Sequence, residues 1–127
     1  MGAKKILIID DEVSFGRLVK LNLELIGNFA VSTAISGEKG IKLAKEVKPD
    51  LILLDILMPG IDGLETLKIL KKDKDTGNIP VIMLTAKINE VTKSQVAESG
   101  ANGYISKPIE AMDLKNKIEE TFKKKSR

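Results

Sequence analysis

Five short apolar segments recur along the chain, and each is bounded by polar or turn-forming residues. They lie at residues 6–9, 30–34, 51–54, 81–84 and 103–106. Three of them, 6–9, 51–54 and 81–84, are continuous runs of Ile, Leu, Val and Met, which is typical of strands buried on both faces. The other two are weaker versions of the same pattern. We therefore predict five β-strands.

Between the first two strands, the apolar residues follow a helical spacing. The positions are Leu18, Leu21 and Leu25, accompanied by Val19, Leu23 and Ile26. Together they predict a helix with a broad apolar face that packs on the sheet. Gly27-Asn28 is a natural end for this helix.

Four more helices are predicted after the remaining strands. The apolar positions are Ile41, Ala44 and Val47 for the second helix, Leu64, Leu67 and Leu70 for the third, and Leu114, Ile118 and Phe122 for the last. Ser36 precedes the second helix, and Asp62 stands three residues before Glu65 at the start of the third, a spacing typical of a capping box. The segment 89–99 carries only Val91, Val96 and Ala97 among polar residues. We expect it to be the helix that is anchored least and moves most readily.

Strands and helices thus alternate five times over 127 residues, the length of one ordinary domain. This order predicts an α/β fold of the flavodoxin-like (βα)5 type, a three-layer sandwich with right-handed crossovers and a parallel five-stranded sheet. In the order 2-1-3-4-5, ligands bind where the chain reverses direction across the sheet, beside the carboxyl ends of strands one and three. We expect residues 1–127 to form a single domain.

The composition narrows the chemistry. The chain has no cysteine and no histidine, which excludes disulfides, thiol catalysis, Ser-His pairs, histidine metal ligands and a phosphohistidine carrier. Carboxylates, lysines and hydroxyls remain, and these suit hard cations and phosphoryl groups. No apolar run resembles a signal-peptide core or a membrane span, so we expect a cytoplasmic protein with no membrane partner.

The net charge of +3 resides entirely in residues 120–127, while residues 1–119 are balanced. Basic residues at a helix end interact favourably with the helix dipole. We interpret the basic run as a solvated terminus and expect no direct nucleic-acid binding by this domain.

Acidic side chains follow two of the predicted strands. Asp10 and Asp11 come after the first strand, and Asp55 comes after the third. Each alone is a common turn residue, but the order 2-1-3-4-5 brings all three to one crevice. Carboxylates about 4 Å apart repel by roughly 4 kcal/mol per pair at an effective dielectric of 20, so the cluster needs a cation or raised pKa values. With oxygen ligands alone, Mg²⁺ is the natural occupant.

The last two strands end in groups that complement a phosphate. Thr85 supplies a hydroxyl after the fourth strand, and Lys107 supplies a positive charge after the fifth. Taken alone, Thr85 would be interpreted as a helix cap and Lys107 as a surface lysine. Beside three acids, both are candidate ligands of a phosphoryl group.

These motifs together resemble a known family. They are Asp10-Asp11-Glu12, the run from Asp55 to Gly63, Thr85-Ala86 and Lys107-Pro108, in this order and each after a strand. The chain resembles, from about Lys4 to Phe122, the CheY-like receiver domains of response regulators in two-component signalling.

The resemblance implies that Asp55 is the phosphoacceptor. It would take a phosphoryl group from the phosphohistidine of a sensor histidine kinase or phosphotransfer protein and form an aspartyl phosphate. Mg²⁺ would be bound directly by Asp11, Asp55 and the backbone carbonyl of Leu57, with Asp10 acting mainly through water. The protein would be a phosphorylation-dependent signalling switch that catalyses only its own phosphorylation and dephosphorylation, and not an enzyme.

The resemblance also assigns the remaining site residues. Lys107 would contact the phosphoryl oxygens, and the Lys107–Pro108 bond would be cis. Thr85 would bond the phosphoryl group after modification, and Tyr104 would be the switch aromatic that turns inward when Thr85 moves. The alternative for Tyr104 is an ordinary half-buried strand residue. The switch would change the face formed by the fourth helix, fifth strand and fifth helix, and so control a downstream target or an output domain outside this chain, or a phosphorylation-linked homodimer.

Three other functions stay open as alternatives. A degenerate receiver would act only as a protein-interaction module. An Asp-nucleophile phosphatase needs two aspartates separated by one residue, whereas Glu12 stands where the second aspartate belongs. A flavodoxin-type binding module would need amide and hydroxyl donors after the first strand, where this chain is acidic.

Overall fold

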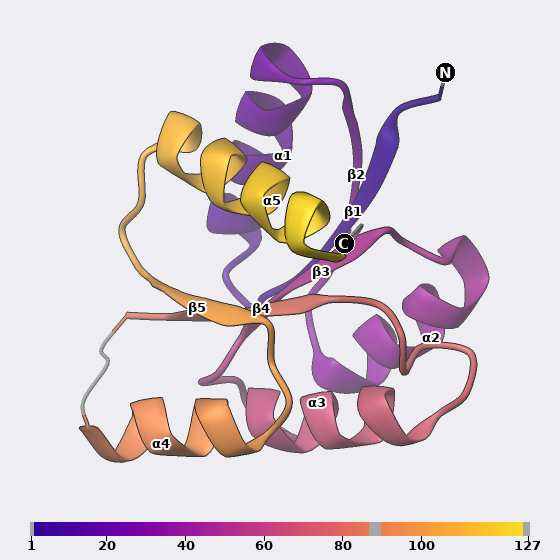
Figure 1. The fold of residues 1–127 in the computed structure, drawn as a ribbon, viewed down its shortest axis with the longest axis vertical. Helices are drawn as coiled ribbons and strands as arrows, with labels where there is room; N and C mark the ends of the chain where they lie inside the picture. Colours follow the sequence, from indigo (N-terminus) through magenta and orange to yellow (C-terminus); the bar gives the residue numbers. More distant parts are fainter. Residues whose placement is uncertain (1, 87–89, 126–127) are drawn as a thin grey trace.

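A parallel sheet of five strands organises the fold (Figure 1). The computed structural model describes residues 2–86 and 90–125. The strands are β1 (Lys4–Ile9), β2 (Phe29–Ala34), β3 (Leu51–Asp55), β4 (Val81–Thr85) and β5 (Gly103–Ser106). Their order is β2-β1-β3-β4-β5, which confirms the predicted topology.

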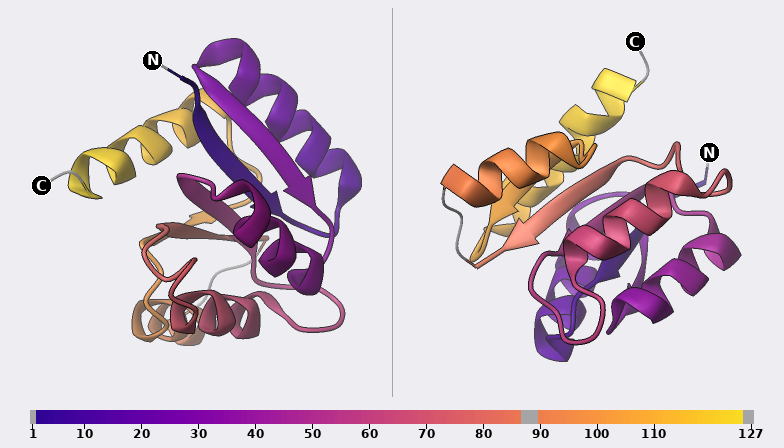
Figure 2. Two further views of the ribbon diagram at one scale, coloured as in Figure 1. Left: turned by 90° about the vertical axis from the view of Figure 1, so that its right-hand side faces the viewer. Right: turned by 90° about the horizontal axis from the view of Figure 1, so that it is seen from below.

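Helices cover both faces of this sheet. They are α1 (Val13–Ile26), α2 (Gly37–Val47), α3 (Gly63–Lys72), α4 (Glu90–Glu98) and α5 (Ala111–Lys125). Helices α1 and α5 lie on one face, and α2, α3 and α4 lie on the other (Figures 1 and 2). The predicted three-layer sandwich is confirmed. In the parts of the chain that the structure describes, no helix is long and apolar enough to cross a membrane.

Two hydrophobic cores result from this layering, one on each side of the sheet. Along β1, Leu7 and Ile9 belong to the core under α2 and α3, whereas Ile6 and Ile8 belong to the core under α1 and α5. Side chains of a strand alternate between faces, so a strand covered on both sides must be apolar at every position. This explains the continuous apolar runs of the central strands.

The predicted caps of α2 and α3 are confirmed. The Ser36 hydroxyl accepts a hydrogen bond from the Lys39 backbone N–H at 3.1 Å, and the Asp62 carboxylate accepts one from the Glu65 N–H at 2.9 Å. Such caps satisfy backbone donors that have no partner inside the helix. The caps fix where each helix begins, and therefore where the loops after β2 and β3 end.

The predicted apolar face of α1 is wrong in part. Leu18 and Leu21 are each 57% exposed and Leu25 is 74% exposed, whereas Val19 and Leu23 are buried against the sheet. Apolar residues cover a wider part of the surface of α1 than can contact the sheet at once. The leucines on the part that points away from the sheet are therefore exposed to water. A stripe of three leucines consequently lies on the surface of the molecule.

Helix α4 has few anchors, as predicted. Among its described side chains, residues 93–98, only Val96 is buried, and it packs into the core under α2 and α3. Asn89 and the side chain of Val91, which were part of the predicted segment, lie outside the described residues. The predicted mobility of this helix remains a prediction.

The two leucine environments of α1 make a direct test of this packing. We expect Leu23→Ala to lower the free energy of unfolding by about 3 kcal/mol, because it leaves a cavity in the core. Leu21→Ala should change it by less than about 0.5 kcal/mol, since that side chain is exposed. Urea denaturation of both variants measures the difference. Equal losses would contradict the orientation of α1.

Candidate functional site

The three predicted carboxylates come together at the carboxyl edge of the sheet. Ile9 at the end of β1 is paired with Leu54 of β3, so Asp10, directly after β1, lies beside Asp55, the last residue of β3. One carboxylate oxygen from each of Asp10, Asp11 and Asp55 lies within 4.8 Å of the other two. Asp10 and Asp55 are buried, while Asp11 is exposed. The predicted convergence is therefore observed in the structure.

Lys107 enters this crevice from the end of β5. Its Nζ atom lies 2.6 Å from Asp10 Oδ2 and 3.7 Å from Asp55 Oδ2, and it also reaches Glu12 Oε1 at 3.1 Å. Only 9% of the lysine side chain is exposed. Burial opposes its charge, but the hydrogen bonds to Asp10 and Glu12 outweigh burial and raise the pKa of Lys107 above its usual value. The ammonium therefore stays charged at neutral pH.

Asp10 is held at both of its oxygens. Oδ1 accepts the backbone N–H of Glu12 at 2.9 Å, and Oδ2 accepts Lys107 Nζ. Glu12 belongs to the acidic motif after β1, but the sequence pattern predicts no role for it in the site. The Glu12 backbone N–H orients the Asp10 carboxylate, and the Glu12 side-chain carboxylate forms an ion pair with the Lys107 ammonium. The sequence does not predict these two contacts of Glu12, because they depend on how the loop turns after β1.

The third carboxylate, Asp55, is buried at the end of β3. Its Oδ1 atom accepts the Leu57 backbone N–H at 3.3 Å. Burial, and then the negative charge of Asp10, raise the pKa of Asp55 to about 6, while the charge of Lys107 acts in the opposite direction. The carboxylate is thus more basic than an ordinary aspartate and still ionised for the most part above neutrality.

The loop after β3 is held close to Asp55 by a glycine. The Gly63 N–H donates to the Ile56 carbonyl oxygen at 2.8 Å. A side chain at this position would collide with the Asp55 backbone carbonyl, since a Cβ atom would stand 2.1 Å from that oxygen. Only glycine lets α3 start so near the strand end, and this fixes the backbone that carries Asp55.

The segment after β5 is fixed in a similar way. The Lys107 backbone N–H donates to the Thr85 carbonyl oxygen at 2.7 Å, which ties the ends of β4 and β5 together. The Lys107–Pro108 peptide bond is cis, as predicted. Thr85 itself is buried at the end of β4. Asp55, Thr85 and Lys107 therefore lie at the carboxyl ends of three neighbouring strands, Asp55 and Thr85 as last residues and Lys107 directly after β5.

Tyr104 lies on β5, two strands away from Asp55 on β3. On β5 it is paired with Met83 of β4, and Thr85 stands two residues after Met83 on the same face of the sheet. The residue is 38% exposed. Tyr104 and Thr85 are thus diagonal neighbours on adjacent strands, on the side of the sheet where α4 packs.

The donor set suits a small hard cation. One oxygen from each carboxylate lies within 4.8 Å of the other two, close to the roughly 4.2 Å that separates two ligands on opposite sides of an ion with ligand distances of about 2.0–2.1 Å. Mg²⁺ retains several waters, and the exposure of Asp11 leaves the site open to them. The residues present therefore fit Mg²⁺.

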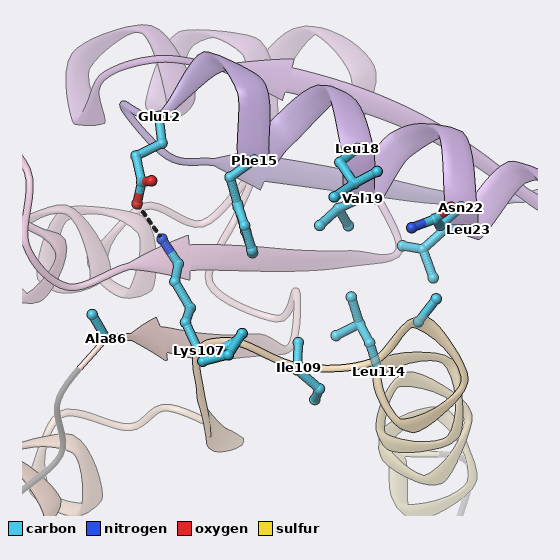
Figure 3. Close-up of a pocket in the computed structure, with 12 residues that line it drawn as sticks. Glu12, Phe15, Leu18, Val19, Asn22, Leu23, Ala86, Lys107, Ile109 and Leu114 are labelled. Atoms are coloured by element: carbon cyan, nitrogen blue, oxygen red, sulfur yellow. Dashed lines mark hydrogen bonds and ion pairs between the residues drawn. The ribbon is translucent and has the colours of Figure 1, made fainter.

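An apolar groove of about 500 Å³ opens beside Lys107, between α1 and the segment that leads into α5 (Figure 3). Its walls include Phe15 and Leu18 of α1, and Ile109 and Leu114 on the other side. The Lys107 ammonium lies over the Phe15 ring, 4.2 Å from its centroid. Sequence reasoning did not single out Phe15, because no motif or periodicity shows that a helix residue faces a lysine 92 positions later.

Comparison with known proteins gives consistent matches. Residues 6–119 match the family model described as response regulator receiver domain. The chain is 38% identical over 123 residues to the DNA-binding dual master transcriptional regulator RpaA of Synechocystis, covering 97% of this chain and 51% of RpaA. It is 42% identical over 115 residues to the alkaline phosphatase synthesis transcriptional regulatory protein PhoP of Bacillus subtilis, covering 91% and 47%. The chain thus spans about half the length of these curated relatives.

Solved structures agree at the level of the fold. The chemotaxis protein CheY4 of Vibrio cholerae superimposes with a TM-score of 0.89 at 27% identity, covering 94% of this chain and 99% of CheY4. A CheY-like response regulator receiver domain protein from Methanospirillum hungatei gives 0.90 at 29% identity, covering 98% of both chains.

The raised pKa of Asp55 has a consequence for stability. The folded chain holds the Asp55 proton more tightly than the unfolded chain, so the fold loses stability as the pH rises from about 4 to about 6 and carries the full cost above that range. In Mg²⁺-free buffer near neutral pH, we expect Asp55→Asn to raise the free energy of unfolding by about 1–2 kcal/mol, less than full burial would give because water reaches the crevice.

Urea denaturation at about pH 7.5 and about pH 4 measures this gain, which should vanish at the lower pH. Asp50→Asn is the matched control, because Asp50 precedes the same strand at the opposite edge of the sheet, where it accepts the Lys5 N–H. A gain that is equal at both pH values, or equal in both variants, would contradict the electrostatic origin.

Proposed function

The chain belongs to the response regulator receiver domain family, and from this membership we propose that it is a phosphorylation-dependent signalling switch whose phosphoacceptor is Asp55. The observation that carries the proposal is the position of Lys107, whose ammonium reaches Asp55 and Asp10 in one buried crevice. A reactive carboxylate beside a fixed positive charge suits a phosphoryl group, which brings several negative oxygens to the same place.

In the proposed reaction, a carboxylate oxygen of Asp55 attacks the phosphorus of a phosphohistidine. The new O–P bond forms as the N–P bond breaks, and the imidazole leaves with the bonding electron pair and takes up a proton. The raised pKa of Asp55 supports this role, because a more basic carboxylate is a better nucleophile while it remains ionised. The product is an aspartyl phosphate.

The carboxylates of Asp11 and Asp55 would hold Mg²⁺ directly. The backbone carbonyl of Leu57 would be the third protein ligand, as the resemblance to receiver domains implies. Asp10 would act mainly through water, since its two oxygens already accept hydrogen bonds from Glu12 and Lys107. The ion supplies positive charge that offsets the charge on the transferring phosphoryl group.

Lys107 and Thr85 receive the phosphoryl oxygens. Lys107 contributes a charge that is already held in the crevice, and Thr85 contributes a hydroxyl from the neighbouring strand. The modification adds roughly −1.5 to −2 charges and three strong acceptors, so both groups are drawn toward Asp55. Movement of Thr85 vacates space on the face of the sheet that carries Tyr104, and the ring turns inward.

This motion changes the face formed by α4, β5 and α5. Helix α4 moves readily because, among its described side chains, only Val96 is buried. A shift from 1:99 to 99:1 between the two states requires about 5.5 kcal/mol of differential interaction, which several charge-assisted contacts can supply. The altered face then controls a target.

The partners follow from the reaction and from the relatives. The phosphoryl donor is a sensor histidine kinase or a phosphotransfer protein in the cytoplasm. Residues 1–127 act as one receiver unit, and the output is a downstream protein, a phosphorylation-linked homodimer or an output domain such as the transcriptional regulators of about twice this length carry. This unit itself contacts neither membrane nor nucleic acid.

The role is regulatory, and the unit catalyses only its own phosphorylation and dephosphorylation. A phosphatase acting on small esters is disfavoured, because Glu12 stands where that chemistry places its second aspartate. A degenerate receiver is disfavoured by the complete set of Asp10, Asp11, Asp55 and Lys107 in contact distance.

Phosphorylation can be tested without knowledge of the kinase. Incubation with acetyl phosphate and Mg²⁺ should add one phosphoryl group, seen by intact-protein mass spectrometry and mapped to Asp55. Asp55→Asn and chelation of Mg²⁺ should each abolish it, while Asp50→Asn, the same substitution at the other end of β3, should be modified like the wild type. An unmodified wild-type chain, or a phosphoryl group on another residue, would refute the proposal.

The switch can be followed through Tyr104, which is the only tyrosine in a chain without tryptophan. We expect phosphorylation to lower the acrylamide quenching of tyrosine fluorescence, because Tyr104, which is 38% exposed in the unmodified protein, turns inward and becomes buried. Thr85→Ala should still be phosphorylated but should keep the quenching of the unmodified protein. Unchanged quenching in the phosphorylated wild type would leave Tyr104 as an ordinary strand residue.

A further inference from the structure

Lys107 is held from two sides, and only one of them is made of carboxylates. Asp10, Glu12 and Asp55 surround the ammonium with negative charge. The Phe15 ring, from the first turn of α1, lies beneath it with 4.2 Å between Nζ and the ring centroid. Figure 3 shows both side chains meeting at the end of the groove next to Glu12.

The carboxylates alone do not determine where the ammonium rests. Glu12 is exposed and draws Nζ toward solvent, whereas Asp10 and Asp55 are buried and draw it inward. A phosphoryl group on Asp55 needs the inner position. An aromatic face attracts a cation within about 6 Å of its centroid and more strongly when water is excluded, and the Lys107 side chain is only 9% exposed.

We propose that Phe15 is a positioning residue for phosphoryl transfer, which holds the Lys107 ammonium in the crevice beside Asp55 through a cation–π contact. The inference rests on the proposed function of Asp55 as phosphoacceptor. Phe15 acts through Lys107 by limiting the time that the ammonium spends with Glu12 at the crevice mouth.

Packing alone does not account for an aromatic residue here. Phe15 is partly buried and packs at the border of the core under α1 and α5, together with Ile109. A leucine would fill such a border position with a similar apolar surface. The property that leucine lacks is the negative face of the ring, and this is the part turned to Lys107.

The test compares phosphorylation rates with acetyl phosphate at saturating Mg²⁺. We expect Phe15→Leu to slow the reaction about fivefold to tenfold, and Phe15→Tyr, which keeps the ring face, to stay within about twofold of the wild type. Phe122→Leu is the matched control, because Phe122 also lies under a lysine, with Lys4 Nζ 5.3 Å from its centroid at the far end of α5. Its rate should equal that of the wild type.

Two further measurements separate positioning from packing. Ring-current shifts should move the Lys107 ε-methylene proton resonances upfield in the wild type and in Phe15→Tyr but not in Phe15→Leu. Replacement of Phe15 by phenylalanines with increasing ring fluorination keeps the shape and folding while weakening the negative face, and the rate should fall with each fluorine.

The outcomes are distinct. A wild-type chain that acetyl phosphate does not modify overturns the proposed function, and the inference with it. A modified wild type whose Phe15→Leu variant reacts equally fast overturns the inference alone. So does a Phe15→Tyr variant as slow as Phe15→Leu, or a fluorinated series with a constant rate, since either result assigns the effect to packing.

Discussion

The structure depends on one electrostatic constraint, the crowding of negative charge at the carboxyl edge of the sheet. Asp10, Asp11 and Asp55 share a space in which their oxygens lie within 4.8 Å of one another. Lys107 is the one ammonium found in contact with this cluster among the described residues, and Glu12 competes for it. The resting site therefore carries more negative than positive charge. Such a site favours cations, and burial together with the neighbouring charge of Asp10 raises the pKa of Asp55.

The fold places these charged side chains outside its two hydrophobic cores. Both cores are apolar, and the polar groups stand where the parallel strands end, in loops fixed by Gly63 and by the Lys107 backbone hydrogen bond to Thr85. Rigid strands with reactive loops at one edge are the arrangement by which open α/β sheets bind ligands. Binding and stability are therefore assigned to different parts of the same chain.

Much of this could be predicted from the sequence because it depends on periodicity and strand order. The apolar runs identify the strands, and the order 2-1-3-4-5 places Asp10, Asp11 and Asp55 together before any coordinates are known. The exposure of Leu18, Leu21 and Leu25 could not be predicted, since periodicity shows that α1 is apolar over a wide arc but not which part faces the sheet. The contacts of Glu12 and Phe15 with Lys107 depend on loop and rotamer geometry, which no sequence pattern encodes.

The order of the strands also links chemical competence to the completeness of folding. Asp10 lies in the first loop of the chain, Asp55 near its middle and Lys107 after its last strand. A nascent chain that lacks β5 cannot present the lysine, and a chain with a displaced edge strand would lose it again. Under the proposed function, only a completely folded molecule could then be phosphorylated at Asp55 next to Lys107, so damaged or unfinished copies would not signal.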